Sequence, residues 1–483
     1  MENKQKINNL RTRVKIVWFR NDLRVHDNDV LAKAANDADY LLPVYCFDPR
    51  QYETTSLGFA KTGAHRARFL IETLANLRAN LEAKGSGLVI RIGKPEEVIA
   101  DLAKTTQAKV VYASQEIGTE EDAIVKQLEK RLWKNQVFLE LLWTGNLIHP
   151  ADLPFPLNSL SNVFTDFRKE IEQGLKVREA VTIPDALPLL PPGVEAGSLP
   201  QITDLGLTHT TPDTRAALHF KGGETAGLQR IEEYIWQRSL LQDYKETRNG
   251  LLGADYSTKF SPWLANGAIS ARMVYHEIKK YEHQVVKNKS TYHLVFELLW
   301  REYFRLVARK YGHRIFVKGG IKAKTDVDMA SNRKRTFKRW KNGETGIPFI
   351  DANMRELNAT GFMSNRGRQN VASYLAKDLK INWVHGAMYF ESQLIDYDVS
   401  SNWCNWNYVA GVGNDPRKDR YFDIPSQASR YDAKGAYVKH WLPELANLPE
   451  NKVHEPHQLK ATEQQAYEMI LGQDYPKPIP CKK

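Results

Sequence analysis

Five short apolar runs recur within the first 143 residues, and they restrict the fold of this part of the chain more than any other feature. All are dense in Val, Ile, Leu and aromatic residues, and helical patterns separate them. Runs of this kind suit strands that are buried on both faces and joined by crossover helices. The sequence therefore predicts an α/β N-terminal domain over residues 1–150, with a doubly wound, five-stranded parallel sheet. The runs are VKIVWF (14–19), LLPVYCF (41–47), LVIRI (88–92), KVVYA (109–113) and VFLELLW (137–143).

The pattern changes twice further along the chain. Repeated prolines in HPADLPFPLNS stop regular structure, and residues 181–211 are rich in Pro, Gly and Thr, which favours an extended surface segment. We therefore expect an interdomain linker over residues 151–223. From residue 224 onward, apolar residues recur three and four apart, as in STYHLVFELLWREYFRLVARKY, which predicts an all-α C-terminal domain over 224–483. The polar N-terminus is expected to be a short disordered extension, and the last residues, QDYPKPIPCKK, a short disordered tail.

Composition narrows the class of protein. The 483 residues are 42% hydrophobic and contain no apolar run of transmembrane length, which predicts a soluble cytoplasmic protein without a membrane partner. Cys46, Cys404 and Cys481 have neither disulfide nor metal-ligand spacing, so a reducing compartment and no metal site are expected. The formal net charge of +11 favours a polyanionic partner such as a nucleic acid.

The segment 361–415 combines charged side chains with indoles in mostly apolar helical sequence. Buried charges without partners are very costly. A polar ligand is therefore expected between them. The residues concerned are Arg368, Asp396, Asp398 and Asn402, set among Trp383, Trp403 and Trp406.

This segment resembles the flavin-binding core of the photolyase and cryptochrome family. The resemblance extends from Trp18-Phe19-Arg20-Asn21-Asp22-Leu23-Arg24, through Asp27-Asn28, to Trp441-Leu442-Pro443-Glu444-Leu445. At two positions the chain resembles the DASH branch: it has Gln369 and Tyr408, where ordinary dimer photolyases usually carry Met and Trp. The resemblance implies a C-terminal domain that binds FAD. It also implies an antenna chromophore in the N-terminal domain, 5,10-methenyltetrahydrofolate in most DASH relatives, with Gln115 and Glu116 as candidate contacts.

The resemblance also assigns residues to the flavin. The turn at 256–261 resembles the family's phosphate-binding turn, although an ordinary Ser/Thr helix cap before Pro262 is an alternative. A flavin-side ion pair, an amide opposite flavin N5 and further cofactor contacts are implied; a buried structural salt bridge with a helix-capping Asn is the alternative. The implied cofactor contacts are Tyr244, Tyr256, Ser257, Thr258, Lys259, Phe260, Ser261, Glu297, Arg301, Asn365, the Arg368 and Asp396 pair, Asp398, and Asn402 opposite N5.

A tryptophan relay is implied as the path by which excited flavin is reduced. Trp406 and Trp383 match its proximal and middle members, although aromatic residues at helical spacing usually serve as core. Ten residues before Trp340, where the distal Trp is expected, stands Ala330. Either another aromatic residue supplies the surface end, or a small displacement of the loop at 326–331 hides the match.

The segment around Glu297 resembles the part of the family that meets both flavin and DNA lesion. Glu297 would bond an extruded pyrimidine dimer and Trp300 would stack on it, although a plain amphipathic helix would place these residues similarly. Arg366 would contact phosphate. Gln369 and Tyr408 make the pocket wall smaller and more polar than in dimer-repairing relatives. Such a wall offers less stacking to compensate for unpairing a duplex, which favours single-stranded DNA. The implied DNA contacts are Glu297, Trp300, Asn365, Arg366, Gln369 and Tyr408, and those implied in catalysis are Glu297, Asn402, Trp383 and Trp406.

Two functions remain open from the sequence. One is a monomeric, light-driven flavoprotein of the deoxyribodipyrimidine photo-lyase type that splits pyrimidine dimers in single-stranded DNA. The other is a blue-light photoreceptor that binds DNA and regulates transcription without repair. A third interpretation, an electron-transfer flavoprotein with no nucleic-acid partner, leaves the net positive charge without a role.

Overall fold

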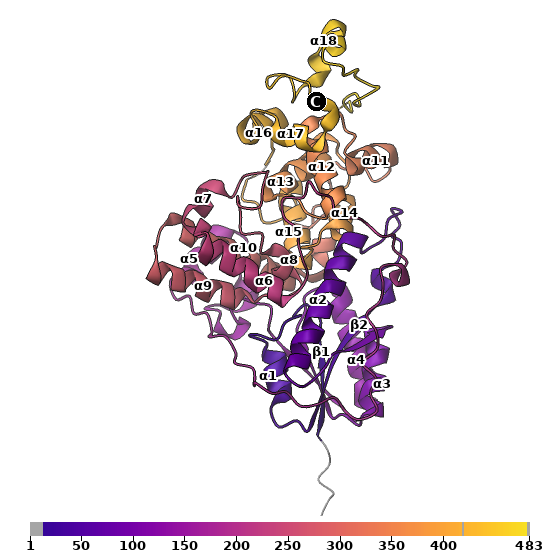
Figure 1. Ribbon diagram of the computed structural model, residues 1–483, viewed down its shortest axis with the longest axis vertical. Helices are drawn as coiled ribbons and strands as arrows, with labels where there is room; N and C mark the ends of the chain where they lie inside the picture. The colour runs from indigo at the N-terminus through magenta and orange to yellow at the C-terminus, as the bar shows by residue number, and fades with distance from the viewer. Residues whose placement is uncertain (1–12, 418–419, 481–483) are drawn as a thin grey trace, which may run out of the picture.

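The computed structural model describes residues 13–417 and 420–480, and it divides into an α/β half and a helical half (Figure 1). In the α/β half, the strand order is β3-β2-β1-β4-β5 and every neighbouring pair is parallel. The predicted sheet is therefore confirmed. The strands are β1 (Val14–Trp18), β2 (Tyr40–Phe47), β3 (Val89–Ile92), β4 (Val110–Ser114) and β5 (Phe138–Leu142).

Helices cover both faces of the sheet. Leu31 and Leu74 pack on one face, whereas Ile99 and Leu128 pack on the other, which is why the strands are apolar on both sides. The order of strands reverses between β1 and β4, and the carboxyl ends of both point toward the helical half. A ligand crevice is expected at such a reversal. The helices are α1 (Asp29–Ala35), α2 (Ala64–Ala83), α3 (Pro95–Thr105) and α4 (Thr119–Lys134).

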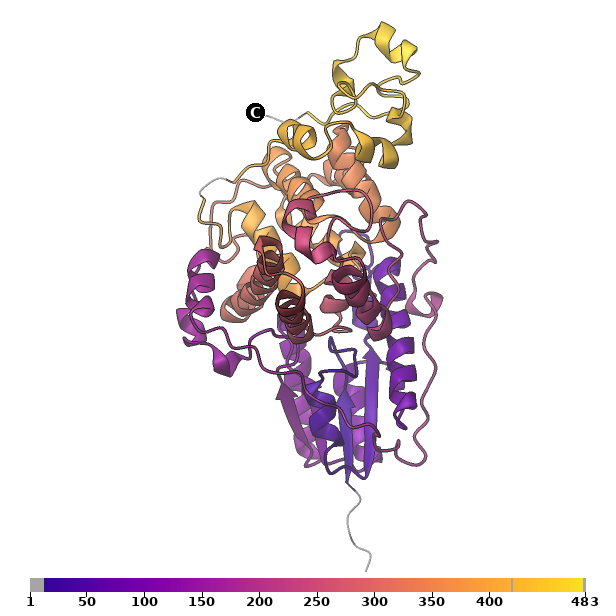
Figure 2. The same ribbon diagram turned by 60° about the vertical axis from the view of Figure 1, so that its left-hand side comes forward.

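The predicted linker at 151–223 contains one α-helix, α5 (Phe164–Glu172). Phe167 of α5 is fully buried in the core of the helical half. The rest of the segment runs along the outside of the α/β half (Figure 2), where Leu41 N donates to Leu189 O at 3.0 Å and Ile90 N to Ala196 O at 2.7 Å. These bonds hold the connection against the sheet. The exact domain boundaries remain a prediction.

The helical half is built around α10 (Lys289–Tyr311), a 23-residue helix that Asn288 caps with a capping box. It packs against α5, α7, α9 and α15, so residues of distant segments meet on its surface. The predicted all-helical C-terminal region is thus confirmed. Its other helices are α6 (Glu224–Ile231), α7 (Tyr244–Thr247), α8 (Ser261–Ala265), α9 (Ala271–Gln284), α11 (Lys334–Asn342), α12 (Pro348–Thr360), α13 (Asn365–Ser373), α14 (Trp383–Gln393), α15 (Val399–Ala410), α16 (Ile424–Tyr431), α17 (Ala436–Trp441) and α18 (Ala461–Ala466).

The expectation of a disordered C-terminal tail is wrong for residues 473–480. Tyr475 is 1% exposed and its hydroxyl donates to Asp351 Oδ2 at 2.6 Å. Ile479 N donates to Thr345 O at 2.9 Å. The segment is ordered because the buried Asp351 carboxylate needs donors, and Tyr475 supplies one of them. Residues 1–12, where the N-terminal extension was expected, and 481–483, which include Cys481, lie outside the described residues.

Two further expectations from the composition concern the cysteines and a membrane-spanning segment. Cys46 and Cys404 are buried free thiols. Among the described residues, 13–417 and 420–480, no helix is long and apolar enough to cross a membrane.

Candidate cofactor and nucleic-acid site

The turn at 256–261 enters α8 with an unusual backbone. Lys259 has φ of 60°, the left-handed region that side chains rarely adopt. Buried Arg230 fixes the turn from behind: its Nε donates to Thr258 O at 3.1 Å and its Nη2 to Ala254 O at 2.9 Å. No side chain caps α8, so the alternative of an ordinary Ser/Thr cap does not describe this turn. Arg230 was missed from sequence, because an Arg within the amphipathic α6 looks like any surface cation.

Three polar atoms near this turn are buried without a hydrogen-bond partner among the residues that the structure describes. They are Lys259 Nζ, the Tyr256 hydroxyl and Asp396 Oδ1. Lys259 is 2% exposed, its Nζ lies 3.1 Å from the centre of the Tyr256 ring, and burial lowers the pKa of this amine well below its ordinary value. Such groups are costly unless a ligand satisfies them. An anionic group such as the diphosphate of a dinucleotide fits the Lys259 amine and the Tyr256 hydroxyl, whereas the Asp396 oxygen needs a hydrogen-bond donor such as a ring N–H.

The turn and the predicted ion pair form one connected network. Asp396 Oδ2 accepts from Ser261 Oγ at 2.6 Å and from Arg368 Nη2 at 2.7 Å. Arg368 Nε donates to Met363 O at 2.9 Å, which aims the guanidinium from α13. Residues from three separate segments thus meet at one carboxylate. Ser257, Thr258 and Phe260 complete the turn beside them, with Phe260 buried in the core.

Asp398 lies at the N-terminus of α15, where its Oδ1 accepts from Ser401 N at 2.7 Å as a helix cap. Burial favours a raised pKa for Asp398, but Arg305, at 3.4 Å from its Oδ2, and Arg301 outweigh burial and hold the pKa below its ordinary value. Arg301 Nη1 donates to Gly145 O at 2.8 Å, so its guanidinium lies toward the α/β half. Burial lowers the pKa of Arg301 to about 10, and it remains a cation at neutral pH.

Asn402 lies inside α15 rather than at its end. Its Nδ2 donates to Ala387 O on α14 at 3.1 Å, and the side chain is buried. The helix-capping alternative is therefore wrong for Asn402, since Asp398 is the cap. The amide oxygen remains free to face a ligand.

The two relay candidates occupy neighbouring helices. Trp383 begins α14, is fully buried and donates Nε1–H to Lys318 O at 3.0 Å. Trp406 of α15 packs edge-on to Phe390 at a centroid distance of 5.1 Å and lies so close to Gly386 that a side chain there would strike its ring. Ala330 pairs with Ile381 through backbone bonds, one residue before Asn382. The backbone therefore holds Ala330 beside Trp383.

On α10, Glu297 meets Arg248, the residue that follows α7. Its Oε1 binds Arg248 Nη1 at 2.5 Å and lies 3.3 Å from His293 Nε2. Tyr244 lies near the same cluster, 6.3 Å from the His293 ring. Glu297 and Arg248 are both partly exposed. Arg248 was missed from sequence, although its position four residues after Tyr244 places both on one face of a helical turn.

The remaining predicted DNA contacts form two groups. Trp300 stacks on Phe164 at 3.7 Å and meets the Tyr408 ring edge-on at 6.1 Å. Arg366 Nη1 donates to Gln369 Oε1 at 2.8 Å and its guanidinium covers the Tyr431 ring at 4.5 Å. Asn365 is exposed at the start of α13. Arg366, Gln369 and Asn365 thus share one helix end, whereas Trp300 and Tyr408 lie on α10 and α15.

A cavity of about 520 Å³ separates the carboxyl ends of the strands from α14 and α15. Of the two candidate antenna residues, Glu116 lines it, and its Oε1 accepts from Ser114 Oγ at 2.8 Å. Gln115 does not line the cavity, because its Nε2 bonds back to Glu116 O at 2.9 Å.

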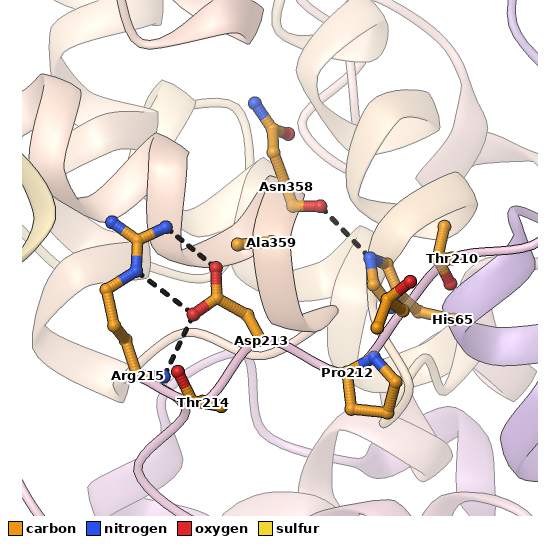
Figure 3. Close-up of a pocket in the computed structure, with 9 residues that line it drawn as sticks. His65, Thr210, Pro212, Asp213, Thr214, Arg215, Asn358 and Ala359 are labelled. Carbon is orange, nitrogen blue, oxygen red and sulfur yellow. Dashed lines mark hydrogen bonds and ion pairs between the residues drawn. The ribbon is translucent and has the colours of Figure 1, made fainter.

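A second, open cavity of about 640 Å³ lies beside the linker (Figure 3). Arg215 and Asp213 pair there at 2.7 Å, and His65 Nε2 bonds to Asn358 O at 3.0 Å. Its charges therefore satisfy each other. It lacks the unpartnered cation of the Lys259 turn.

Comparison with known proteins identifies the two halves. Residues 15–188 match the DNA photolyase family, and residues 294–482 match the FAD binding domain of DNA photolyase. A cryptochrome DASH of Gloeobacter violaceus is 52% identical over 97% of this chain and 93% of its own length. The Synechocystis cryptochrome crystal structure has a TM-score of 0.93 at 49% identity, covering 96% of each chain. An archaeal photolyase from Sulfolobus tokodaii, solved with two FAD molecules, has a TM-score of 0.77 at 26% identity, covering 96% of each chain.

These matches span nearly the whole chain and agree with the fold built above. The identity to the cryptochrome DASH sequence is high over almost its entire length. The chain belongs to the DASH cryptochromes of the photolyase family and carries the FAD-binding domain of that family.

Proposed function

We propose that this chain is a light-driven flavoprotein that repairs cyclobutane pyrimidine dimers in single-stranded DNA. The observation that carries the proposal is the set of unpartnered buried atoms, Lys259 Nζ, the Tyr256 hydroxyl and Asp396 Oδ1. When bound, FAD supplies the light absorption and the electron that splits the dimer. The protein's own residues bind, orient and exclude water.

The cofactor assignments follow from this network. Lys259 and the hydroxyls of Ser257, Thr258 and Ser261 hold the diphosphate, where the bound anion restores the charged state of the buried amine. With FAD bound, Asp396, oriented by Arg368, would use its free oxygen to accept a hydrogen bond from the cofactor. The Asn402 amide oxygen faces the ring from α15. Tyr256 and Tyr244 cover the sides of the ligand.

The lesion side rests on Glu297 and Trp300. These two residues lie three apart on α10, and hence on one face of the helix. In the proposed complex, Glu297 exchanges its Arg248 partner for the polar edge of an extruded base, and Arg248 and Arg366 turn to phosphate. One face of Trp300 is already covered by Phe164, and Tyr408 bonds to Arg420 at 2.8 Å. Little apolar stacking surface remains to offset unpairing, which favours single strands.

The antenna belongs in the 520 Å³ cavity. Trp18 and Trp403 provide aromatic surface there, and Glu116 provides a carboxylate that can accept from the amino group of a pterin. We propose 5,10-methenyltetrahydrofolate as its occupant. The protein is further proposed to act as a cytoplasmic monomer.

The test is a repair assay on dimer-containing oligonucleotides, single-stranded and duplex, with reduced protein under blue light and in the dark. We expect light-dependent repair of the single strand, much weaker repair of the duplex, and loss of repair in Glu297→Ala. Glu129→Ala on exposed α4 is the matched control and should repair normally. Tight DNA binding with no repair would contradict the proposal and favour the photoreceptor that regulates transcription.

A further inference from the structure

We propose that the electron path of this chain ends at Tyr397, on the wall of the interdomain cavity, and runs from Trp406 through Trp383 and Trp403. The inference rests on the proposed flavin function, because it describes how the flavin site is reduced. It assigns roles to Trp403, Tyr397 and Glu391, side chains on helices α14 and α15 and the loop between them.

The usual surface end of the path is missing for a definite reason. Ala330 N donates to Lys380 O at 2.8 Å, and Asn382 N donates to Ala330 O at 2.9 Å. Asn382 Nδ2 also reaches Ser331 Oγ at 3.3 Å. These bonds fix the register of the loop on both sides of Ala330, so a displaced loop does not bring another residue to this position. A methyl group stands where an oxidisable ring would be needed.

A second pair of rings adjoins Trp383 instead. The Trp383 and Trp403 rings meet edge-on with centroids 6.0 Å apart. Trp403 is three residues before Trp406 on α15, so it lies on the same side of that helix. Trp403 Nε1 donates to the Tyr397 hydroxyl at 3.2 Å. The rings therefore form an unbroken chain from Trp383 to a phenol.

Tyr397 is suited to be the end of the chain because a base is beside it. A phenol that loses an electron becomes a strong acid, so oxidation is easy only where a proton acceptor is in reach. Burial and the nearby Glu391 carboxylate raise the pKa of the Tyr397 hydroxyl, and both side chains line the same cavity. Arg66 covers the Tyr397 ring at 4.4 Å and bonds to Glu391 O at 3.2 Å, which holds the cluster together.

The cluster opens onto solvent through the interdomain cavity. Trp403, Tyr397, Glu391 and Arg66 all line this space of about 520 Å³. In protein without a bound antenna, a small reductant can therefore reach Tyr397, whereas Trp383 is fully buried.

The electron and proton balance is as follows. With FAD bound and excited by light, Trp406 would supply it with one electron, and electrons from Trp383, Trp403 and Tyr397 would refill the vacancies in turn. Tyr397 gives its hydroxyl proton to the Glu391 carboxylate and becomes a neutral radical. A small thiol in the cavity then returns one hydrogen atom to Tyr397, and Glu391 releases its proton to solvent. Two thiyl radicals combine to a disulfide.

A competing branch exists on the other side of Trp406. The Trp340 ring lies 6.3 Å from Trp406 and 6.1 Å from Tyr389. Tyr389 donates to the Asn358 amide oxygen at 2.6 Å, and the Lys341 amine lies 5.8 Å from its ring. An amide is a poor proton acceptor, so the Asn358 side chain does not favour loss of the Tyr389 hydroxyl proton. Tyr389 is therefore the matched control for Tyr397.

The experiment follows flavin photoreduction by absorbance and the protein radical by electron paramagnetic resonance, in FAD-loaded protein with dithiothreitol. Tyr397→Phe should lower the photoreduction yield about tenfold and abolish the tyrosyl signal, whereas Tyr389→Phe should leave both unchanged. In Tyr397→Phe, the added change Ala330→Trp should restore the yield by supplying a surface indole. In the parent, radical formation should be slower in D₂O than in H₂O. Glu391→Gln should slow radical formation and abolish this solvent isotope effect.

Two results would overturn the inference while leaving the flavin function intact: an unchanged yield in Tyr397→Phe, or a loss of yield in Tyr389→Phe. A flavin-free parent protein would instead contradict the proposed function. If Tyr397→Phe binds FAD poorly, the path is tested instead by electron paramagnetic resonance of the parent protein labelled with ring-deuterated tyrosine. Its radical spectrum should narrow, and an unaltered tryptophanyl spectrum would contradict the path.

Discussion

Charged side chains are buried at two places, the interface between the two halves and the Lys259 turn. The two places differ in whether these side chains have hydrogen-bond partners in the protein. At the interface, Asp27 binds Arg272 Nη2 at 2.5 Å and Val181 N at 2.8 Å, and Glu302 accepts from Asn146 and Leu147 N. Both oxygens of each carboxylate have protein partners. At the turn, the Lys259 amine has no hydrogen-bond partner among the described residues and lies 3.1 Å from the centre of the Tyr256 ring.

The difference separates structural charges from charges kept for a ligand. A fully paired buried ion holds two halves in register and loses stability when one partner is removed. An unpaired one lowers stability until something binds. The two regions should therefore respond to charge removal with opposite signs, which gives the following predictions, ordered from the largest expected effect.

Asp27→Asn should lower the free energy of unfolding by about 3 kcal/mol, because it leaves Arg272 buried with part of its charge uncompensated. Urea unfolding followed by circular dichroism measures this. The control is Asp39→Asn, which breaks the exposed pair with Arg13 and should have a much smaller effect. Equal effects of the two substitutions would contradict a structural role for the interface pair.

Glu356→Gln should remove a pH dependence of stability from the apoprotein. Burial raises the pKa of Glu356 to about 7, although Tyr437, Lys259 and Arg368 oppose the shift. The folded state therefore holds this proton more tightly than the unfolded state, so stability is lost as pH rises from about 4.5 to about 7, by roughly 3 kcal/mol. Glutamine stays neutral and should flatten the unfolding midpoint between pH 5 and 8.

The control for this second prediction is Glu129→Gln, since Glu129 is exposed on α4. It should keep the parent slope. A parent-like slope in Glu356→Gln would mean that another group carries the dependence.

Arg366→Ala should have the smallest effect, on DNA rather than on folding. Its guanidinium bonds to neutral partners, Gln369 and Asn249, so its charge is available to a phosphate. We expect weaker binding of single-stranded DNA at every sequence, with a salt slope reduced by about 1. Fluorescence anisotropy over a salt series measures the slope. Arg131→Ala, which removes a cation paired with Glu97 on the α/β half, should leave it unchanged.

The sequence predicts the fold well because its signals are local. The five apolar runs end close to where the strands end, since a strand buried on both faces admits few polar residues. The tail at 473–480 could not be recognised, because its order depends on a hydrogen bond from Tyr475 to Asp351, more than a hundred residues away. Local composition carries no trace of such a contact.

The candidate site is only partly visible in the sequence. The turn at 256–261 and the Arg368 and Asp396 pair follow from motifs. Arg230, Arg248 and Glu356 do not, because each acts through a partner on a different segment. The Tyr397 and Glu391 cluster has the same character, since it is assembled across the loop between α14 and α15.

Titration of the apoprotein with FAD, in the parent and in Lys259→Met, tests most directly whether the unpartnered amine is reserved for a ligand. We expect the variant to bind FAD about 100-fold more weakly, the equivalent of roughly 3 kcal/mol, while its apoprotein unfolds at an equal or higher urea concentration. Lys126→Met, on exposed α4, should change neither. Parent-like FAD affinity in Lys259→Met, or a destabilised apoprotein, would contradict the account.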